Sequence, residues 1–305
     1  MSLRTKALIA IIAVSMLWGT AGTAKILLKS FDPFTAAFIR FLIASIVMLP
    51  FFLHEQRKCR KALSPLLPVA LLSTGNILFF YWGLRTTTAS ATAVIYAAVP
   101  LIVAIAAPKL IGEEITRTKR IGIGIGLIGA LFIAVLPALE RGSSQISGDF
   151  IGNMFVLLAA CCWSGYTIAS RTMLAAKRTT PVIMTAISFF VSTGIFSVLS
   201  AVRWRPEYIS AFTPVNVIIF LQLGILVTTF TYLILQWIIK HSSATTASLN
   251  QYLQPIFGIL FNSVFLGERL TVGFLIGSVI AFSGVVLATG ERVFTECTSW
   301  KNKRA

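Results

Sequence analysis

The stretch LIGEEIT, residues 110–116, recurs as FLGERLT at residues 265–271, and each copy stands directly before a long apolar run. Both copies read apolar, apolar, Gly, Glu, charged, apolar, Thr, at an offset of 155 residues. The same offset pairs Ala89 with Ala244, Pro100 with Pro255, Gly122 with Gly277 and Gly129 with Gly284, without a gap. Self-similarity at a fixed spacing indicates a duplicated architecture.

The beginning of each copy is marked by a second offset, of 145 residues. It aligns LWGTAGTAK, residues 17–25, with CWSGYTIAS, residues 162–170, so that Trp18 corresponds to Trp163. The sequence therefore predicts two halves, residues 1–142 and 143–305, the second ending in a short basic tail.

Composition places both halves in a membrane. Hydrophobic residues make up 56% of the chain and charged residues only 12%, against about a quarter charged in soluble domains. The apolar residues gather in ten runs, at about 7–28, 33–53, 65–84, 89–110, 121–139, 150–170, 181–202, 214–239, 243–266 and 272–290. Runs of about 20 residues match a hydrocarbon core of roughly 30 Å. Because lipid satisfies no backbone group, each run is predicted to be one helix of an all-α polytopic membrane protein.

The net charge of +16 is explained by topology, without a nucleic-acid partner. Most of the 26 Lys and Arg residues fall in the N-terminal segment, the even-numbered connections and the tail. This bias predicts that both termini are cytoplasmic and that the protein is a multi-pass component of the cell (inner or plasma) membrane. With five helices per half, the second half must enter from the opposite side. The predicted fold is two inverted-topology five-helix repeats, a plan in which substrates bind near the midplane.

A family resemblance is carried by the ten spans, the LWG and CWSGYTIASR stretches, IRFLIASIVMLP (residues 39–50) and the paired Pro and Gly-Glu ends of spans four and nine. In these features the chain resembles the ten-helix EamA-type branch of the drug/metabolite transporter superfamily. The resemblance covers nearly the whole chain. It implies a ten-helix inverted-repeat fold and the export or exchange of small metabolites, often amino acids.

Motifs for cofactors, metals and catalysis are weak here. GIGLIG, residues 124–129, matches the dinucleotide fingerprint but lies inside a span, where small residues let helices approach closely. Cys161 and Cys162 point to different helix faces and are interpreted as small buried hydrophobic residues. All ten carboxylates lie in loops or at span edges. We therefore expect no enzymatic activity, no cofactor and no metal site.

Polar and aromatic residues inside the spans define the candidate site, because in lipid such groups face other helices or a cavity. The candidates that stack on substrate are Trp18, Tyr81, Tyr96 and Trp163, and those that hydrogen-bond it are Asn76, Asn250, Gln251 and Gln254. A stripe of Thr229, Tyr232 and Gln236 lies on span eight. Pro100 and Pro255 occupy matching mid-span positions and are predicted to interrupt their helices as hinges.

Two cations also lie within spans. Lys25 shares a helix face with Trp18 and Gly22, and it either reaches the membrane surface or faces a substrate carboxylate. For Arg40, within the second-span stretch, an architectural role is favoured.

Together these features predict a secondary carrier in the lipid bilayer. It would export or exchange amino acids or related zwitterionic or anionic metabolites by alternating access. The alternative is a polytopic membrane sensor or a channel without carrier activity.

Overall fold

The computed structural model describes residues 2–59, 62–140, 149–266 and 272–290. Up to residue 140 its elements are α1 (Leu3–Gly19), η1 (Thr20–Thr23), α2 (Ala24–Leu27), α3 (Pro33–Cys59), η2 (Ser64–Leu66), α4 (Leu67–Gly83), α5 (Ala89–Ala97), α6 (Val99–Ile111) and α7 (Arg117–Glu140). From residue 149 they are α8 (Phe150–Ala175), α9 (Pro181–Val202), η3 (Pro206–Tyr208), α10 (Pro214–Leu221), η4 (Gln222–Phe230), α11 (Thr231–His241), α12 (Ala244–Ser248), α13 (Asn250–Leu266) and α14 (Val272–Gly290). Every element in these ranges is helical, which confirms the predicted class.

Within the described ranges, nine helical stretches are long and apolar enough to cross a membrane. The tenth predicted span, at 243–266, is present as α12 and α13, which a turn at Leu249 separates. Since α13 alone has 17 residues, it is slightly shorter than a standard span of about 20 residues. The ten-helix architecture is therefore confirmed.

Four spans depart from a regular α-helix; an interruption was predicted for the fourth and the ninth, but not for the first and the eighth. The first span changes to the 3₁₀ turn η1 after Gly19, and the fourth breaks at Ala98 between α5 and α6. The ninth breaks at Leu249. In the eighth, the nine-residue π-helix η4 separates α10 from α11. Irregular backbone is tolerated at membrane depth where it is buried in protein or lines a water-filled cavity, so we expect these breaks to face away from the lipid.

Side chains supply part of the bonding of the π-helix. The Thr228 hydroxyl donates to the Leu223 carbonyl at 2.8 Å and the Thr229 hydroxyl to the Gly224 carbonyl at 2.9 Å. Both bonds reach five residues back along the chain, which matches the π-helical register. Gly224 is also the point where a neighbouring helix comes close, because a Cβ there would lie 2.7 Å from the Ile43 side chain of α3.

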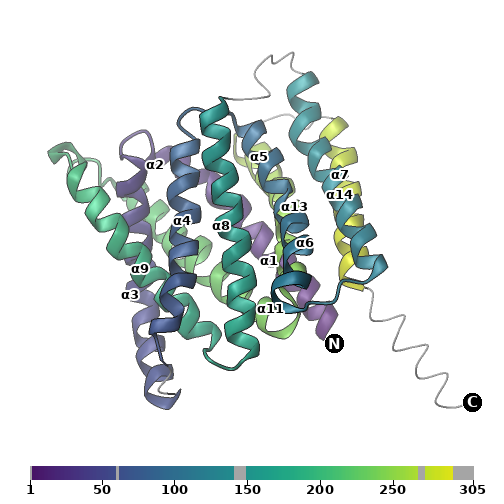
Figure 1. Ribbon diagram of the computed structural model, residues 1–305. Helices are drawn as coiled ribbons and strands as arrows, with labels where there is room; N and C mark the ends of the chain where they lie inside the picture. The colour runs from purple at the N-terminus through teal and green to yellow at the C-terminus, as the bar shows by residue number, and fades with distance from the viewer. Residues whose placement is uncertain (1, 60–61, 141–148, 267–271, 291–305) are drawn as a thin grey trace, which may run out of the picture.

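The two repeats pack against each other along the whole bundle. Figure 1 shows α3 beside α9 at one edge and α7 beside α14 at the other, and both pairs are in contact. Between them α4 packs on α8 and α1 on α13. Each of these pairs joins an element of the first repeat to one of the second. The start of α1 and the end of α14 lie on the same face of the bundle (Figure 1).

Glycines allow the backbones of α7 and α14 to touch. A Cβ on Gly122 would lie 2.7 Å from the Gly284 carbonyl oxygen, and one on Gly277 would lie 2.9 Å from that of Gly129. Gly122 and Gly129 of α7 thus lie against Gly284 and Gly277 of α14, which are the glycines that correspond to them in the second repeat, in reversed order. Gly126 and Gly129 of GIGLIG therefore belong to a helix-packing seam, as predicted, because a side chain on Gly129, or on Gly284 where it meets Gly126, would push the two backbones apart. A Cβ on Gly124, in contrast, would meet no atom of the described residues within 4 Å.

Candidate functional site

Trp18 and Trp163, which occupy matching positions in the two repeats, meet in the middle of the bundle. Their ring centroids are 5.5 Å apart in an edge-to-face arrangement, and the side chains come from α1 and α8. They are 9% and 3% exposed. Such aromatic pairs are favourable and specific in geometry, so this pair fixes how the first helix of one repeat meets that of the other.

Three further rings join the Trp pair, and we call the five residues Trp18, Trp163, Tyr166, Phe189 and Tyr232 the central aromatic cluster. The centroid of Tyr232 lies 5.8 Å from that of Trp163 and 5.2 Å from that of Phe189. Tyr166 lies 5.5 Å from Trp163. Tyr166 and Phe189 were missed by the sequence reasoning, although Tyr166 stands in the same CWSGYTIAS stretch as Trp163. Tyr232 was noticed only as part of a polar stripe.

The polar edges of this cluster are hydrogen-bonded to residues of η4, α4 and α11. The Trp18 indole N–H donates to the Val227 carbonyl of η4 at 3.0 Å. The hydroxyls of Tyr232 and Ser73 are 3.3 Å apart. The Gln236 amide donates to the Tyr166 hydroxyl at 2.7 Å. Because buried hydroxyls, amides and indole N–H groups need partners, these bonds hold the rings in one arrangement.

Asn76 and Tyr96 form a second part of the candidate site. The Asn76 amide donates to the Tyr96 hydroxyl at 2.6 Å and to the Ala159 carbonyl at 2.9 Å. Ala159 lies one turn before Trp163 on α8, so this pair adjoins the central aromatic cluster. The ring of Tyr96 packs edge-to-face on Phe80, with centroids 5.5 Å apart.

The three amide residues of the ninth span lie at the start of α13. Asn250 is fully buried, and both polar atoms of its side chain lack a hydrogen-bond partner among the described residues. Its carbonyl accepts a bond from the Ser15 hydroxyl at 3.1 Å, which places it one helical turn from Trp18. Gln251 is buried and Gln254 is half-buried. An unsatisfied buried amide costs about 1–3 kcal/mol.

Two predicted site residues are not placed with the others. Tyr81 packs against Phe34, with ring centroids 6.5 Å apart, near one end of the bundle. The backbone of Lys25 belongs to α2, but its side chain lies outside the described residues.

The two predicted hinge prolines differ in their relation to the breaks. Pro100 lies in the first turn of α6, directly after the break at Ala98. Pro255 lies inside α13, five residues beyond its first residue. Since proline lacks a backbone N–H, Pro100 prevents α5 and α6 from forming one regular helix. Pro255 cannot account for the break at Leu249 in the same way.

An ionic cluster closes the face of the bundle opposite to the start of α1, and we call Asp32, Phe34, Arg85 and Arg203 the Asp32 cluster. The Asp32 carboxylate lies 3.5 Å from Arg203 and 3.7 Å from Arg85. Both guanidinium groups also lie over the Phe34 ring, at 4.8 and 5.4 Å from its centroid. Ion pairs near the surface contribute about 0–1 kcal/mol each, so these two pairs add little to stability.

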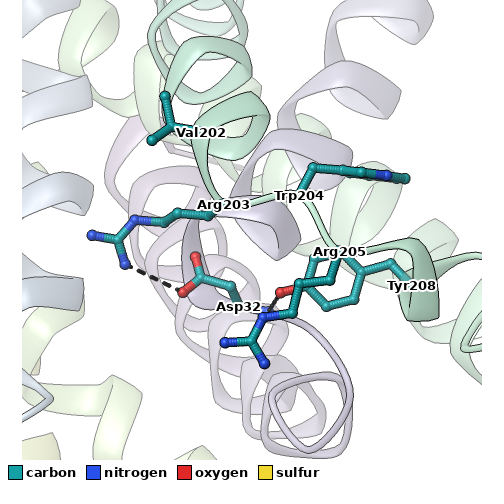
Figure 2. A pocket seen from close by; sticks show the side chains of 6 residues that line it. All are labelled: Asp32, Val202, Arg203, Trp204, Arg205 and Tyr208. Atoms are coloured by element: carbon teal, nitrogen blue, oxygen red, sulfur yellow. Dashed lines mark hydrogen bonds and ion pairs between the residues drawn. The ribbon is translucent and has the colours of Figure 1, made fainter.

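A cavity of about 330 Å³ adjoins the Asp32 cluster, lined by Asp32, Val202, Arg203, Trp204, Arg205 and Tyr208. In Figure 2 the Arg203 guanidinium points at the Asp32 carboxylate, whereas the Trp204 ring points away from it. The Tyr208 hydroxyl accepts a bond from the Asp32 backbone N–H at 3.2 Å. The cavity therefore lies at the mouth of the bundle. The central aromatic residues, in contrast, pack directly against one another.

The opposite face is closed by the repeated Gly-Glu stretch. The Glu113 carboxylate accepts bonds from the backbone N–H groups of Ala244 at 3.0 Å and Thr245 at 3.2 Å, which are the first two residues of α12. Lys119 lies 3.4 Å from the same carboxylate and donates to the Ser243 hydroxyl at 2.8 Å. A loop of the first repeat thus caps a helix of the second.

The surroundings of Glu113 favour the ionised form of its carboxyl group. Burial alone would raise its pKa, but Lys119 and hydrogen bonds from Thr245 and Ser243 outweigh it, and the net effect lowers the pKa. The carboxylate is therefore ionised at neutral pH, as a cap at a helix N-terminus requires. Its repeat counterpart Glu268 lies outside the described residues.

The chain matches the model of the EamA-like transporter family twice, over residues 5–135 and 150–290. It is 27% identical to a transporter of Archaeoglobus fulgidus, covering 92% of this chain and 97% of the relative. It is 26% identical to the inner membrane transporter YedA of Escherichia coli, covering 93% and 91% of the two chains. A solved crystal structure with 18% sequence identity superposes with a TM-score of 0.74 over 93% of this chain and 98% of that one, which supports the fold.

Proposed function

The chain belongs to the EamA-like transporter family, and from that premise we propose that it is a secondary carrier for small organic metabolites. It exports or exchanges amino acids or related zwitterionic and anionic compounds by alternating access. The substrate binds between the two repeats, near the middle of the membrane.

The observation that carries this proposal is the contact between Trp18 and Trp163. Two side chains that correspond in the two repeats meet with ring centroids 5.5 Å apart, and carriers built from inverted repeats bind substrate between the repeats near the midplane. Their faces offer stacking surface for an apolar or aromatic side chain. Separation of the two rings would open a space shared by both repeats.

Amides near the Trp pair supply the polar part of the site. The buried Asn250 side chain has both a donor and an acceptor without a partner among the described residues, so it pairs with polar groups of a substrate. Asn76 donates through its amide nitrogen to Tyr96 and Ala159, so its amide oxygen and the Tyr96 O–H supply another acceptor and donor on the first repeat. Gln251 and Gln254 extend the amide surface along α13, and Lys25 is a candidate cation from the sequence.

Alternating access needs one closure on each side of the site. The Asp32 cluster and the Glu113 cap provide them at opposite ends of the bundle. The Asp32 cluster is partly exposed, whereas the Glu113 and Lys119 side chains are each only 10% exposed. Because the Asp32 pairs are partly exposed and contribute little, whereas the Glu113 carboxylate also accepts two backbone hydrogen bonds from α12, we infer that the Asp32 side opens more easily in this conformation.

Counterflow in proteoliposomes tests carrier function against a channel or a sensor. Vesicles loaded with an unlabelled amino acid mixture are diluted into labelled substrate, and a carrier produces a transient accumulation of label above equilibrium. A channel equilibrates the label without overshoot, and a sensor transports none. Accumulation that needs an internal substrate supports the proposal, and its absence with every metabolite class contradicts it.

A further inference from the structure

We propose that Arg40 is the residue that recognises the anionic group of the substrate, which makes that substrate a carboxylate. This inference rests on the proposed carrier function and assigns a substrate class to its site. Arg40 lies seven residues inside α3, at a depth of about 10 Å along the helix axis. A guanidinium at such a depth is costly unless it has a function or a partner.

The partners that the structure gives Arg40 are neutral. Its Nε–H donates to the Thr228 hydroxyl, and its guanidinium carbon lies 5.7 Å from the centroid of the Phe41 ring. No carboxylate forms an ion pair with it among residues 2–59, 62–140, 149–266 and 272–290. Asp32, on the same helix end, is already engaged by Arg85 and Arg203.

Most of the hydrogen-bonding capacity of Arg40 is therefore unused. A guanidinium has five N–H donors, and within the described chain only the Nε–H has a protein acceptor. The terminal Nη groups form the fork that matches a planar carboxylate in two parallel bonds. The side chain is half-buried, so an anion that bound there would be partly shielded from water.

Two lines of contact place this guanidinium beside the central aromatic cluster. Thr228, its hydroxyl partner, follows Val227, whose carbonyl accepts the Trp18 indole N–H. Phe41, which the guanidinium contacts, packs at a tilt against Phe189 with centroids 5.9 Å apart, and Phe189 packs on Tyr232 at 5.2 Å. A substrate with its side chain between the Trp rings would therefore find the cation at one end.

Both contacts fall within the π-helix η4. Its consecutive residues Val227 and Thr228 receive Trp18 from α1 and Arg40 from α3, and the hydroxyls of Thr228 and Thr229 bond five residues back. Single-turn π segments are frequent at functional sites. A nine-residue segment that anchors both a stacking residue and a cation fits a binding site better than simple packing.

The test is binding to matched pairs of probes: L-phenylalanine with L-phenylalaninamide, and 3-phenylpropionic acid with 3-phenylpropionamide. The purified full-length protein is titrated in detergent, and the affinity ratio of acid to amide is obtained from thermal shifts. We expect the wild type to prefer the acids by about tenfold or more. Arg40→Gln should bring the ratio close to one while amide binding is retained. Arg40→Lys should keep part of the preference, because it keeps the charge but not the fork.

Three further variants separate recognition from architecture. Arg57→Gln makes the same change at the exposed end of α3 and should leave the ratio as in the wild type. Thr228→Val removes the protein partner but keeps the cation, so it should retain the acid preference. Lys25→Gln tests the competing cation. If Arg40→Gln does not fold, Arg40→Lys is measured instead. Its acid-to-amide affinity ratio should be several-fold lower than that of Arg57→Gln.

The assignment is overturned if the wild type shows no acid preference, if the Arg40 variants keep it in full, or if Lys25→Gln alone abolishes it. The carrier proposal fails separately. If the wild type binds the acids through Arg40 but shows no counterflow of them in proteoliposomes, Arg40 remains the anion site and the transport proposal is contradicted.

Discussion

At the scale of single residues, the centre of this protein is held by side chains that come from distant parts of the chain. Trp18 contacts Trp163 through its ring and Val227 through its indole N–H. The two contacts use different parts of one side chain, because the ring packs edge-to-face on Trp163 while the N–H donates a hydrogen bond to Val227. Substitution can therefore remove them separately.

Trp18→Ala should reduce substrate affinity by about tenfold or more, because a large stacking surface is lost. The affinity of Trp18→Phe should lie between those of the wild type and Trp18→Ala, since phenylalanine keeps a ring but removes the indole N–H that donates to the Val227 carbonyl. A double-mutant cycle with Trp163→Ala should give a coupling of about 0.5–1.5 kcal/mol. Trp204→Ala, at the mouth of the bundle, is the control for loss of a tryptophan. Additive effects of Trp18→Ala and Trp163→Ala would contradict a shared site.

At the scale of elements, a loop of one repeat terminates a helix of the other. Glu113 bonds the first two N–H groups of α12, and Lys119 neutralises its charge. The free N–H groups at a helix start require acceptors, and a carboxylate is the strongest protein acceptor for them. This explains why so apolar a chain keeps the polar LIGEEIT stretch.

Glu113→Gln should destabilise the folded protein by about 1–3 kcal/mol, because it replaces a buried charged acceptor by a neutral one and removes the carboxylate that Lys119 pairs with. Thermal unfolding in detergent measures the loss, and hydrogen exchange at α12 should rise. Glu114→Gln, on the exposed neighbour, should have little effect. If both substitutions lowered the stability equally, the Glu113 carboxylate would not be a specific cap of α12.

The same residue predicts a dependence of stability on pH. Because its pKa is lower in the folded protein than in an unfolded chain, Glu113 contributes its full stabilisation above the usual glutamate range. That contribution is lost as the pH falls through the depressed folded value. Denaturation midpoints measured from about pH 7 down to about pH 3 should therefore converge for the wild type and Glu113→Gln. A difference that stayed constant over this range would show that ionisation of Glu113 is not the cause.

Interrupted helices allow a prediction about the hinge prolines. Pro100→Ala supplies the missing N–H next to the break at Ala98, so α5 and α6 can join and bend less easily. It should slow transport more than it weakens binding. Pro255→Ala should act less, because the break of that span lies at Leu249. Pro108→Ala, near the end of α6, is the control. If Pro100→Ala changed the rate of substrate transport and the binding affinity in parallel, a hinge at this position would be excluded.

At the scale of the whole molecule, the proposed arrangement is two repeats that enter the membrane from opposite sides. We predict that the face where α1 begins is cytoplasmic. A cysteine introduced as Glu114→Cys should then be protected from an impermeant reagent in intact cells, and Glu207→Cys on η3 should react. The background lacks the native cysteines. If only Glu114→Cys were labelled, the face where α1 begins would be extracytoplasmic and the predicted orientation would be wrong. If both cysteines were labelled equally, the inverted arrangement would be contradicted.

The class of the protein, the number of its spans and its internal repeat all follow from the order of residues along the chain. They are local properties, because lipid imposes helical runs of a set length and a duplication keeps its own spacing. For the same reason the GIGLIG seam and the correspondence of Trp18 with Trp163 are predictable from the chain alone.

Which side chains meet depends instead on how the helices pack. Glu113 reaches α12 across 131 residues, and Arg40 reaches Thr228 across 188. Tyr166 and Phe189 join the Trp pair, whereas Tyr81 lies apart with Phe34. Hydropathy carries no information on how far a helix is rotated about its axis, and the π-helix in η4 changes that rotation midway along a span. The partners of a side chain inside a bundle depend on that rotation, so they are a property of the packed molecule.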